Sequence, residues 1–328
     1  MLKRALRSIA SIASIASIVS IASIASIASA APPIRLWEGT PVRAKSVTLV
    51  PYLPSSAPAL PAVTVPEGSP EGFGGGSSAI IVCPGGSYCW HDYEAEGTRV
   101  AEWLQREGIA AFVLKYRVQG IGPYVFHTRL VSRGHQHPDA LCDVQRAIQY
   151  VREHAADFGI DPHRLGVMGF SAGGHLSMSA AAYAATDFLA PLGIEHSVSL
   201  RPDFVAPIYP VVTMHKPFVH TRSRRALLGE YRKHRQAMRD SMSLELHIPA
   251  DCPPVFLLNC TDDPIVMYQN SELLDSALTA AHIPHLYTQY RVGGHGFGGD
   301  TTKFSAETKH WQETFMEWLR KTLPPPSL

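Results

Sequence analysis

The chain has 328 residues, of which 45% are hydrophobic and 17% are charged, and its formal net charge is +1 at pH 7. That length allows one large domain or two small ones, and the hydrophobic content is ordinary for a globular protein. Acidic and basic residues are interspersed, so the basic footprint of a nucleic-acid-binding protein is missing and we expect no nucleic-acid partner.

The histidines and cysteines form no metal-binding pattern. The 16 histidines are scattered, with no His-x-x-x-His pair, and no Cys-x-x-Cys pair occurs, so we predict no metal site. The 5 cysteines are odd in number. Cys83 and Cys260 fall in predicted buried strands, where cysteine behaves as a small hydrophobic residue, and we predict no disulfide framework.

Residues 1–30 are typical of a secretory signal peptide. Lys3, Arg4 and Arg7 precede an Ile-Ala-Ser repeat whose isoleucines recur at every third position. This spacing lags a helical turn by about 60° per step, so the isoleucines surround the helix and leave no polar face. The basic start, the apolar run and Ala-Ser-Ala at 28–30 predict cleavage after Ala30 and a secreted or periplasmic protein. The alternatives are an uncleaved membrane anchor and, less favoured, a cytosolic low-complexity tail.

Residues 31–77 predict an N-terminal strand followed by a Pro/Gly-rich connector. One strand candidate spans residues 46–52, and the Pro, Gly and Ser content of the remainder predicts a loop.

From residue 78 to 328 the pattern predicts a single catalytic domain. Unbroken apolar strands alternate with helices, which indicates an α/β fold with a mainly parallel central sheet and helices on both faces. The predicted strands span residues 79–83, 109–116, 165–170, 204–209, 254–259 and 285–292, and the predicted helices span 94–107, 138–156, 175–185, 270–281 and 306–322.

The alternation of strands and helices fails between residues 214 and 248. This segment is basic and irregular, and its cations are Arg222, Arg224, Arg225, Arg232, Lys233 and Arg235. It is either a cap or surface insertion near the carboxyl edge of the sheet, or a solvated helical hairpin.

Residues 169–174, Gly-Phe-Ser-Ala-Gly-Gly, fit the Gly-x-Ser-x-Gly pattern between a predicted strand and a predicted helix. In this pattern a tight turn presents a nucleophilic serine, here Ser171, in a strained backbone conformation. Gly169 and Gly173 leave room for such a turn. An ordinary turn of small residues would also fit, so the assignment of Ser171 depends on its partners.

A serine hydroxyl needs a base beside it and a carboxylate that orients the base. In sheets with this turn the acid and then the histidine follow the serine along the chain. Asp262 and Asp263 directly follow a predicted buried strand, and His295 lies among glycines after the last strand. We predict Ser171 as the nucleophile, His295 as the general base and Asp263 as the acid. Asp262 is the competing acid, which could instead hold its own turn.

The predicted oxyanion-binding groups are backbone amides. One is Ala172, directly after the nucleophile, and the other is Gly86 or Ser87 in the glycine-rich loop after the strand at 79–83. A simple glycine turn is the alternative for that loop. The aromatic residues that follow, Tyr88 and Trp90, are predicted to bind substrate by lining a pocket for an acyl group or a sugar ring. They could equally be packing under the loop.

Residues from about 79 to 320 resemble an α/β-hydrolase of the esterase/lipase superfamily, in particular its acetylxylan-esterase-like and feruloyl-esterase-like bacterial branch. Four stretches carry the resemblance: Pro-Gly-Gly-Ser-Tyr at 84–88 with Glu-Gly at 96–97; Asp143 with Arg-Ala-Ile at 146–148; Gly-Phe-Ser-Ala-Gly-Gly-His-Leu at 169–176; and Asp-Asp-Pro at 262–264 with Gly-His-Gly-Phe at 294–297. The resemblance implies hydrolysis of short acyl esters on plant cell-wall polysaccharide, with no metal or organic cofactor. The sequence departs from the family pattern at Ser87, where a third glycine is usual, at Asn259 and at Met267.

The sequence therefore predicts a serine carboxylesterase for acetyl or feruloyl esters of a small molecule or a xylan-type polysaccharide. A prolyl-oligopeptidase-like peptidase uses the same triad but usually carries a large gating domain, for which no segment is predicted. A lipase would show a long apolar lid, and none is seen. The alternative from another class is a catalytically silent carbohydrate-binding protein of this fold, which typically lacks a triad member, whereas all three positions are filled here.

Overall fold

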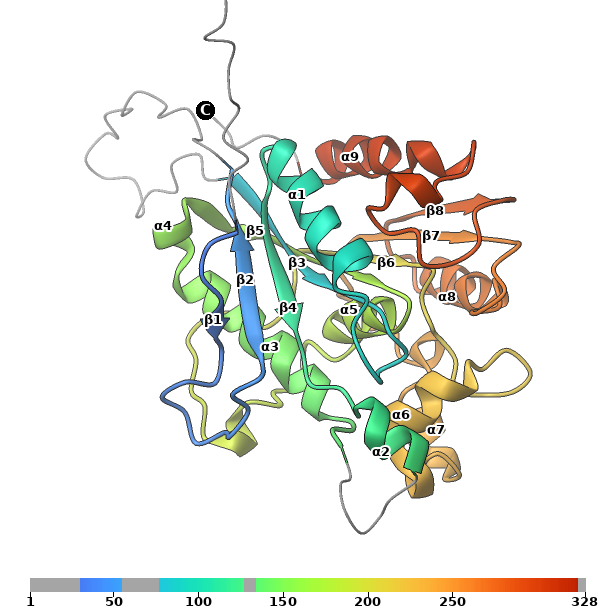
Figure 1. Cartoon of the computed structure of the whole chain (residues 1–328), viewed down its shortest axis with the longest axis horizontal. Helices are drawn as coiled ribbons and strands as arrows, with labels where there is room; N and C mark the ends of the chain where they lie inside the picture. The colour runs from blue at the N-terminus through green and yellow to red at the C-terminus, as the bar shows by residue number, and fades with distance from the viewer. Residues whose placement is uncertain (1–29, 55–76, 127–133, 324–328) are drawn as a thin grey trace, which may run out of the picture.

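The computed structural model describes residues 30–54, 77–126 and 134–323 (Figure 1). The predicted signal peptide, apart from Ala30, and the predicted connector beyond residue 54 lie outside the described residues. Within the described ranges, no helix combines the length and the apolar character that a membrane span requires.

The described strands form one sheet in the order β1-β2-β4-β3-β5-β6-β7-β8. The strands are β1 (Ile34–Arg35), β2 (Thr48–Tyr52), β3 (Ser77–Cys83), β4 (Ala110–Lys115), β5 (Ile160–Phe170), β6 (Phe204–Ile208), β7 (Val255–Cys260) and β8 (His285–Tyr290). Strands β3 to β8 are parallel, whereas β1 and β2 run antiparallel at one edge. The predicted mainly parallel sheet is confirmed.

Helices cover both faces of this sheet, with α1 and α9 on one face and α3, α5 and α8 on the other (Figure 1). The described helices are α1 (Arg99–Arg106), α2 (Ile121–Phe126), α3 (Asp139–Glu153), α4 (Ala155–Phe158), α5 (Ala172–Ala182), α6 (Thr221–Arg232), α7 (Gln236–Asp240), α8 (Gln269–Ala280) and α9 (Trp311–Thr322). The helix expected at 94–107 is interrupted, because a π-helix, η1 (Glu94–Thr98), precedes α1.

The central strands are apolar throughout because both of their faces are covered. In β3, Ile80 and Val82 belong to the core under α1 and α9, whereas Ile81 and Cys83 belong to the core under α3 and α5. All four side chains are fully buried. An unbroken apolar run is the pattern that a parallel strand between two helical layers requires. All five cysteines are buried and free, and Cys83 and Cys260 lie in the strands β3 and β7.

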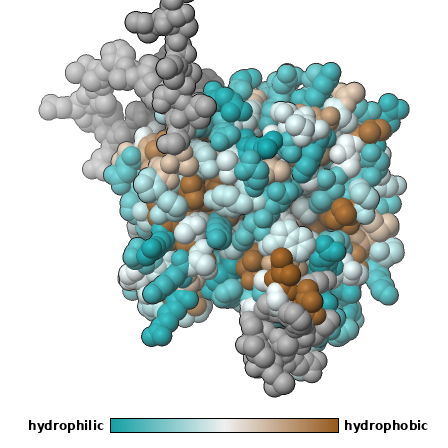
Figure 2. Space-filling model, in the orientation of Figure 1, coloured by the Kyte–Doolittle hydropathy of each residue, from teal (hydrophilic) through white to brown (hydrophobic). Residues whose placement is uncertain are grey.

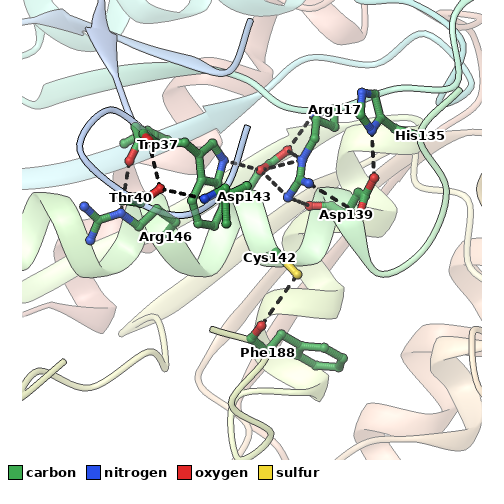
Figure 3. A network of polar contacts seen from close by, with 11 residues as sticks. Trp37, Thr40, Arg117, His135, Asp139, Cys142, Asp143, Arg146 and Phe188 are labelled. Atoms are coloured by element: carbon green, nitrogen blue, oxygen red, sulfur yellow. Dashed lines mark hydrogen bonds and ion pairs between the residues drawn. The ribbon is translucent and has the colours of Figure 1, made fainter. Parts of the chain in front are cut away.

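The N-terminal segment packs onto α3 through a polar network (Figure 3). The Trp37 indole N–H donates to Asp143 Oδ1 at 2.7 Å, and the Arg117 guanidinium pairs with the same oxygen at 2.8 Å. The Arg117 backbone N–H donates to Asp143 Oδ2 at 2.7 Å. Since Asp143 is fully buried, these donors replace the water it has lost. The sequence predicted one strand in this segment, at residues 46–52, which corresponds to β2. It predicted neither β1 nor the contact with α3.

Residues 214–248 form α6, α7 and a 3₁₀ turn at Leu244–Leu246. Helix α6 buries Ala226, Leu227 and Leu228, and the Leu244 N–H donates to the Val212 carbonyl at 3.2 Å, just beyond β6. The segment therefore has buried contacts near the carboxyl edge of the sheet.

Most of the face shown in Figure 2 is polar, with brown patches where apolar side chains reach the surface. Among the exposed large apolar residues, Ile121 and Val125 both belong to the short helix α2, where they are 58% and 54% exposed. Helix α2 follows β4 along the chain (Figure 1).

Candidate active site

Ser171 occupies a strained turn between β5 and α5. Its φ is 55° and its ψ is −114°, a region that non-glycine residues seldom adopt. A Cβ on Gly169 would collide with the Gly173 carbonyl, and a Cβ on Gly173 would collide with the Cys83 carbonyl. Glycine at 169 therefore permits the tight turn itself, and glycine at 173 permits the close approach of α5 to β3.

Ser171, His295 and Asp263 form one hydrogen-bonded chain. His295 Nε2 lies 2.9 Å from Ser171 Oγ, and His295 Nδ1 lies 2.6 Å from Asp263 Oδ2. The carboxylate can only accept from Nδ1–H, which leaves the Nε2 lone pair free to accept the serine proton. The backbone N–H groups of Ile265 and Val266 donate to Asp263 Oδ1 at 2.8 and 2.9 Å and fix the carboxylate in place.

These three residues meet because each follows a parallel strand of one sheet. Ser171 follows β5, Asp263 follows β7 and His295 follows β8, so all three lie at the carboxyl edge. Asp262 has a different task from its neighbour. Its Oδ1 accepts from the N–H groups of Gly293 at 3.0 Å and Gly294 at 2.8 Å, which holds the loop that carries His295.

The two segments that carry the predicted oxyanion donors both adjoin the serine. Ala172 is the first residue of α5, and the N–H groups of a first helical turn have no acceptor within the helix. The glycine-rich loop approaches from β3, since a Cβ on Gly85 would lie 3.0 Å from Ser171 Cβ. Gly86 and Ser87 follow with φ values of 127° and 59°, while the Gly85 N–H is bonded to a carboxylate oxygen of Glu96.

The two aromatic residues predicted to bind substrate differ in their exposure to solvent. Tyr88 is only 3% exposed, and its hydroxyl donates to His175 Nδ1 at 2.8 Å. His175 Nε2 in turn faces the Met242 carbonyl at 2.9 Å. Tyr88 is thus packed under the loop, which corrects its assignment to the substrate-binding surface. Trp90 is 37% exposed, and the Arg222 guanidinium of α6 lies 5.6 Å from its ring centroid.

Two residues that the sequence did not single out for the site support it. The Tyr209 ring lies 4.6 Å from the His295 ring, centroid to centroid, and the Tyr209 hydroxyl donates to Glu96 Oε1 at 2.8 Å. Glu96 is buried, and burial raises the pKa of its carboxyl to about 7. Tyr209 fell inside the predicted strand 204–209, whereas β6 ends at Ile208, so no sequence signal pointed to it. Glu96 belonged to the resemblance without an assigned role.

A mostly parallel sheet with a serine on the turn between strand and helix defines an α/β-hydrolase fold. The structure is similar, with a TM-score of 0.72 and 31% identity over 88% of this chain and 96% of the other, to an acetyl ester-xyloside bifunctional hydrolase from Caldicellulosiruptor lactoaceticus. A thermophilic esterase from Thermogutta terrifontis shares the fold, with a TM-score of 0.66 at 22% identity over 91% of this chain and 95% of the other.

Within this class the chain belongs to the BD-FAE family, whose model matches residues 69–278. It is 32% identical over 218 residues to an endo-1,4-beta-xylanase B from Butyrivibrio fibrisolvens, covering 66% of this chain and 32% of that protein. It is 29% identical over 253 residues to an acetylxylan esterase from Xylanibacter ruminicola, covering 76% of this chain and 46% of that protein. The matches thus span about a third to a half of the length of these relatives.

Proposed function

We propose that the protein is a serine carboxylesterase that removes short acyl groups, acetyl above all, from xylan-type polysaccharide. The observation that carries the proposal is the unbroken hydrogen-bonded chain from Asp263 through His295 to Ser171 on a strained turn. The names of the relatives, an acetylxylan esterase and a xylanase among them, support the substrate. Feruloyl is the second acyl group to test.

In the first step, Ser171 Oγ attacks the ester carbonyl carbon while its proton passes to His295 Nε2. The carbonyl oxygen becomes an oxyanion, to which we assign the Ala172 N–H and an N–H of Gly86 or Ser87 as hydrogen-bond donors. Asp263 stabilises the imidazolium that forms. When the C–O bond to the sugar breaks, the leaving oxygen takes the proton from Nε2 and the acyl group remains on Ser171.

In the second step, water attacks the acyl-enzyme and its proton passes to His295 Nε2. The tetrahedral intermediate collapses, the carboxylic acid leaves, and Ser171 Oγ recovers the proton. Trp90, which is 37% exposed and lies against Gly86, offers a flat ring on which a sugar can stack, and the Arg222 guanidinium lies against that ring.

The replacement Ser171→Ala tests the reaction. We expect hydrolysis of p-nitrophenyl acetate to fall by at least about a thousandfold, because the nucleophile is lost. Ser177→Ala is the matched control, since Ser177 is a buried serine of α5 that donates to the Gly174 carbonyl at 2.9 Å. It should retain near wild-type turnover. Undiminished hydrolysis in folded Ser171→Ala would refute the proposal.

Substrate range is measured with the wild-type protein. We expect acetate release from native acetylated xylan to exceed release from other acetylated polysaccharides, and acetyl esters to be cleaved faster than feruloyl or long-chain esters. Cleavage of a proline amide in preference to any ester would point to a peptidase instead.

We further propose that residues 1–30 direct export and are removed after Ala30, which would bring the protein to a polymer outside the cytoplasm. N-terminal sequencing of the protein recovered from a secreting host tests this. A mature chain that begins at residue 31 supports export with cleavage, and retention of residue 1 in a membrane fraction supports an anchor.

A further inference from the structure

Glu96 is a buried carboxylate beside the site that the proposed mechanism does not use. It lies in the π-helix Glu94–Thr98 and is 2% exposed. A π-helical turn is rare and recurs at functional sites. Removing a carboxylate from water is costly unless its partners compensate, so the identity of those partners shows what Glu96 holds in place.

One oxygen of Glu96 holds the oxyanion loop, which we define as residues 84–88. The Gly85 N–H donates to Glu96 Oε2 at 2.7 Å, and the Gly85 carbonyl accepts from the Asp92 N–H at 3.0 Å. A Cβ on Gly85 would collide with Oε2, so glycine is what permits this approach. The residue directly before the predicted donor Gly86 is therefore fixed on both sides of its backbone by residues 92–96.

The other oxygen of Glu96 holds the histidine loop, which we define as residues 293–299. Tyr209 donates its hydroxyl proton to Glu96 Oε1 at 2.8 Å, and the Tyr209 oxygen accepts from the Gly298 N–H at 3.0 Å. A Cβ on Gly298 would lie 3.0 Å from Glu96 Cγ, and the Gly299 N–H donates to the Ala95 carbonyl at 2.7 Å. The π-helix is therefore in contact with both loops.

We propose that Glu96 is a positioning residue that ties the oxyanion loop to the histidine loop and so sets the distance between the oxyanion donors and the general base. The inference rests on the proposed function. Oxyanion donors act on charge that develops only in the transition state. Loosening the tie should therefore lower kcat and leave KM nearly unchanged.

The experiment uses Glu96→Gln, Tyr209→Phe and the double variant. Glutamine keeps the volume of Glu96 but offers one acceptor oxygen where the carboxylate offers two, and phenylalanine removes the hydroxyl that links Glu96 to Gly298. The assay follows p-nitrophenyl acetate hydrolysis at pH 8.5, above the pKa of about 7 of Glu96. A p-nitrophenyl phosphonate titrates the reactive serine, so that kcat is counted per folded site.

We expect Glu96→Gln to lower kcat by about 10- to 100-fold and Tyr209→Phe by about 10-fold, with KM within about twofold of wild type. Because Glu96 and Tyr209 act through the same hydrogen-bonded connection, their effects should not multiply. The kcat of the double variant should be no more than about threefold below that of the less active single variant. Asp143→Asn is the control, since Asp143 is another fully buried carboxylate with several donors. It should lower the urea midpoint and leave kcat per titrated site within about twofold.

Unchanged kcat in both single variants would overturn the inference, and so would losses that multiply in the double variant. An equal loss of kcat in Asp143→Asn would also overturn it, because any buried carboxylate would then have the same effect. The two proposals fail separately. Full activity of Ser171→Ala would refute the proposed function. Loss of activity in Ser171→Ala together with an unchanged kcat in Glu96→Gln would refute only the role of Glu96.

Discussion

Two adjacent carboxylates show how contacts assign roles to single residues. Asp263 accepts from His295, whereas Asp262 accepts from the backbone of Gly293 and Gly294. The two side chains have the same chemistry and leave the same turn. Only Asp263 reaches the imidazole, so only it can select the tautomer in which Nε2 accepts the serine proton.

The pair Asp263→Asn and Asp262→Asn tests this difference. The first change should lower kcat for p-nitrophenyl acetate by about 10⁴-fold, because an amide no longer favours the Nδ1–H tautomer or the imidazolium. The second should lower kcat by at most about tenfold, because the asparagine oxygen can still accept from the two glycine N–H groups. Steady-state kinetics on both variants measure the effect, and equal losses would contradict the assignment.

At the scale of elements, the loop after β3 and the turn between β5 and α5 are built against each other. The Cys83 carbonyl lies where a Cβ on Gly173 would stand, and Gly85 lies against Phe170 and Ser171. Neighbouring parallel strands bring their carboxyl ends together, so two loops must share a narrow space. Side chains are excluded there, and this brings Gly85 of the glycine-rich loop against the nucleophile.

The replacement Gly173→Ala tests how tightly these elements are packed. We expect it to lower the free energy of unfolding by about 3 kcal/mol, because the new methyl group overlaps the backbone of β3. Gly122→Ala in α2 is the control, since a Cβ there meets no atom of the described residues within 4 Å. That change should leave stability within about 1 kcal/mol of wild type. Urea unfolding followed by circular dichroism provides the comparison, and similar effects at both positions would contradict it.

At the scale of the whole molecule, burial keeps several histidines neutral. It lowers the pKa of four side chains from 6.5 to about 4, namely His91, His137, His175 and His220. Between pH 6.5 and about pH 4, these histidines bind protons in the unfolded chain but not in the folded chain. The free energy of unfolding therefore decreases as the pH falls through this range. Glu96 acts in the opposite sense, because burial raises its pKa from 4.5 to about 7 and the folded chain then binds the proton first.

Burial also raises the pKa of the Asp143 carboxyl, so four histidines are opposed by two carboxyls. We expect the histidines to dominate and the free energy of unfolding to be lower at pH 5 than at pH 7. His91→Phe should reduce that difference by about 2 kcal/mol, because one of the groups is removed. The ring of His91 packs edge-on against Tyr116 with centroids 4.6 Å apart, and phenylalanine preserves this contact. Urea titrations at both pH values measure the change. The exposed His234→Gln is the control, and an unaltered difference in His91→Phe would contradict the account.

The sequence alone determined the sheet, the strained serine turn and the order of the residues that meet beside it. These features depend on local patterns: apolar runs where strands are covered on both faces, glycines where backbones approach, and polar residues directly after strands. The start of α5 differs from the prediction, because the helix begins at Ala172 and was expected to begin at residue 175. Gly173 and Gly174 are helical although glycine is a weak helix former, so the sequence favoured a later start.

Only the tertiary structure decided the direction of side chains in loops. Tyr88 points into the core toward His175 while Trp90 points outward, although they stand two residues apart. The tie from Gly85 through Glu96 and Tyr209 to Gly298 joins residues that are distant along the chain. A local pattern reports only on neighbours in sequence, whereas a loop side chain takes the direction in which distant elements satisfy its hydrogen bonds.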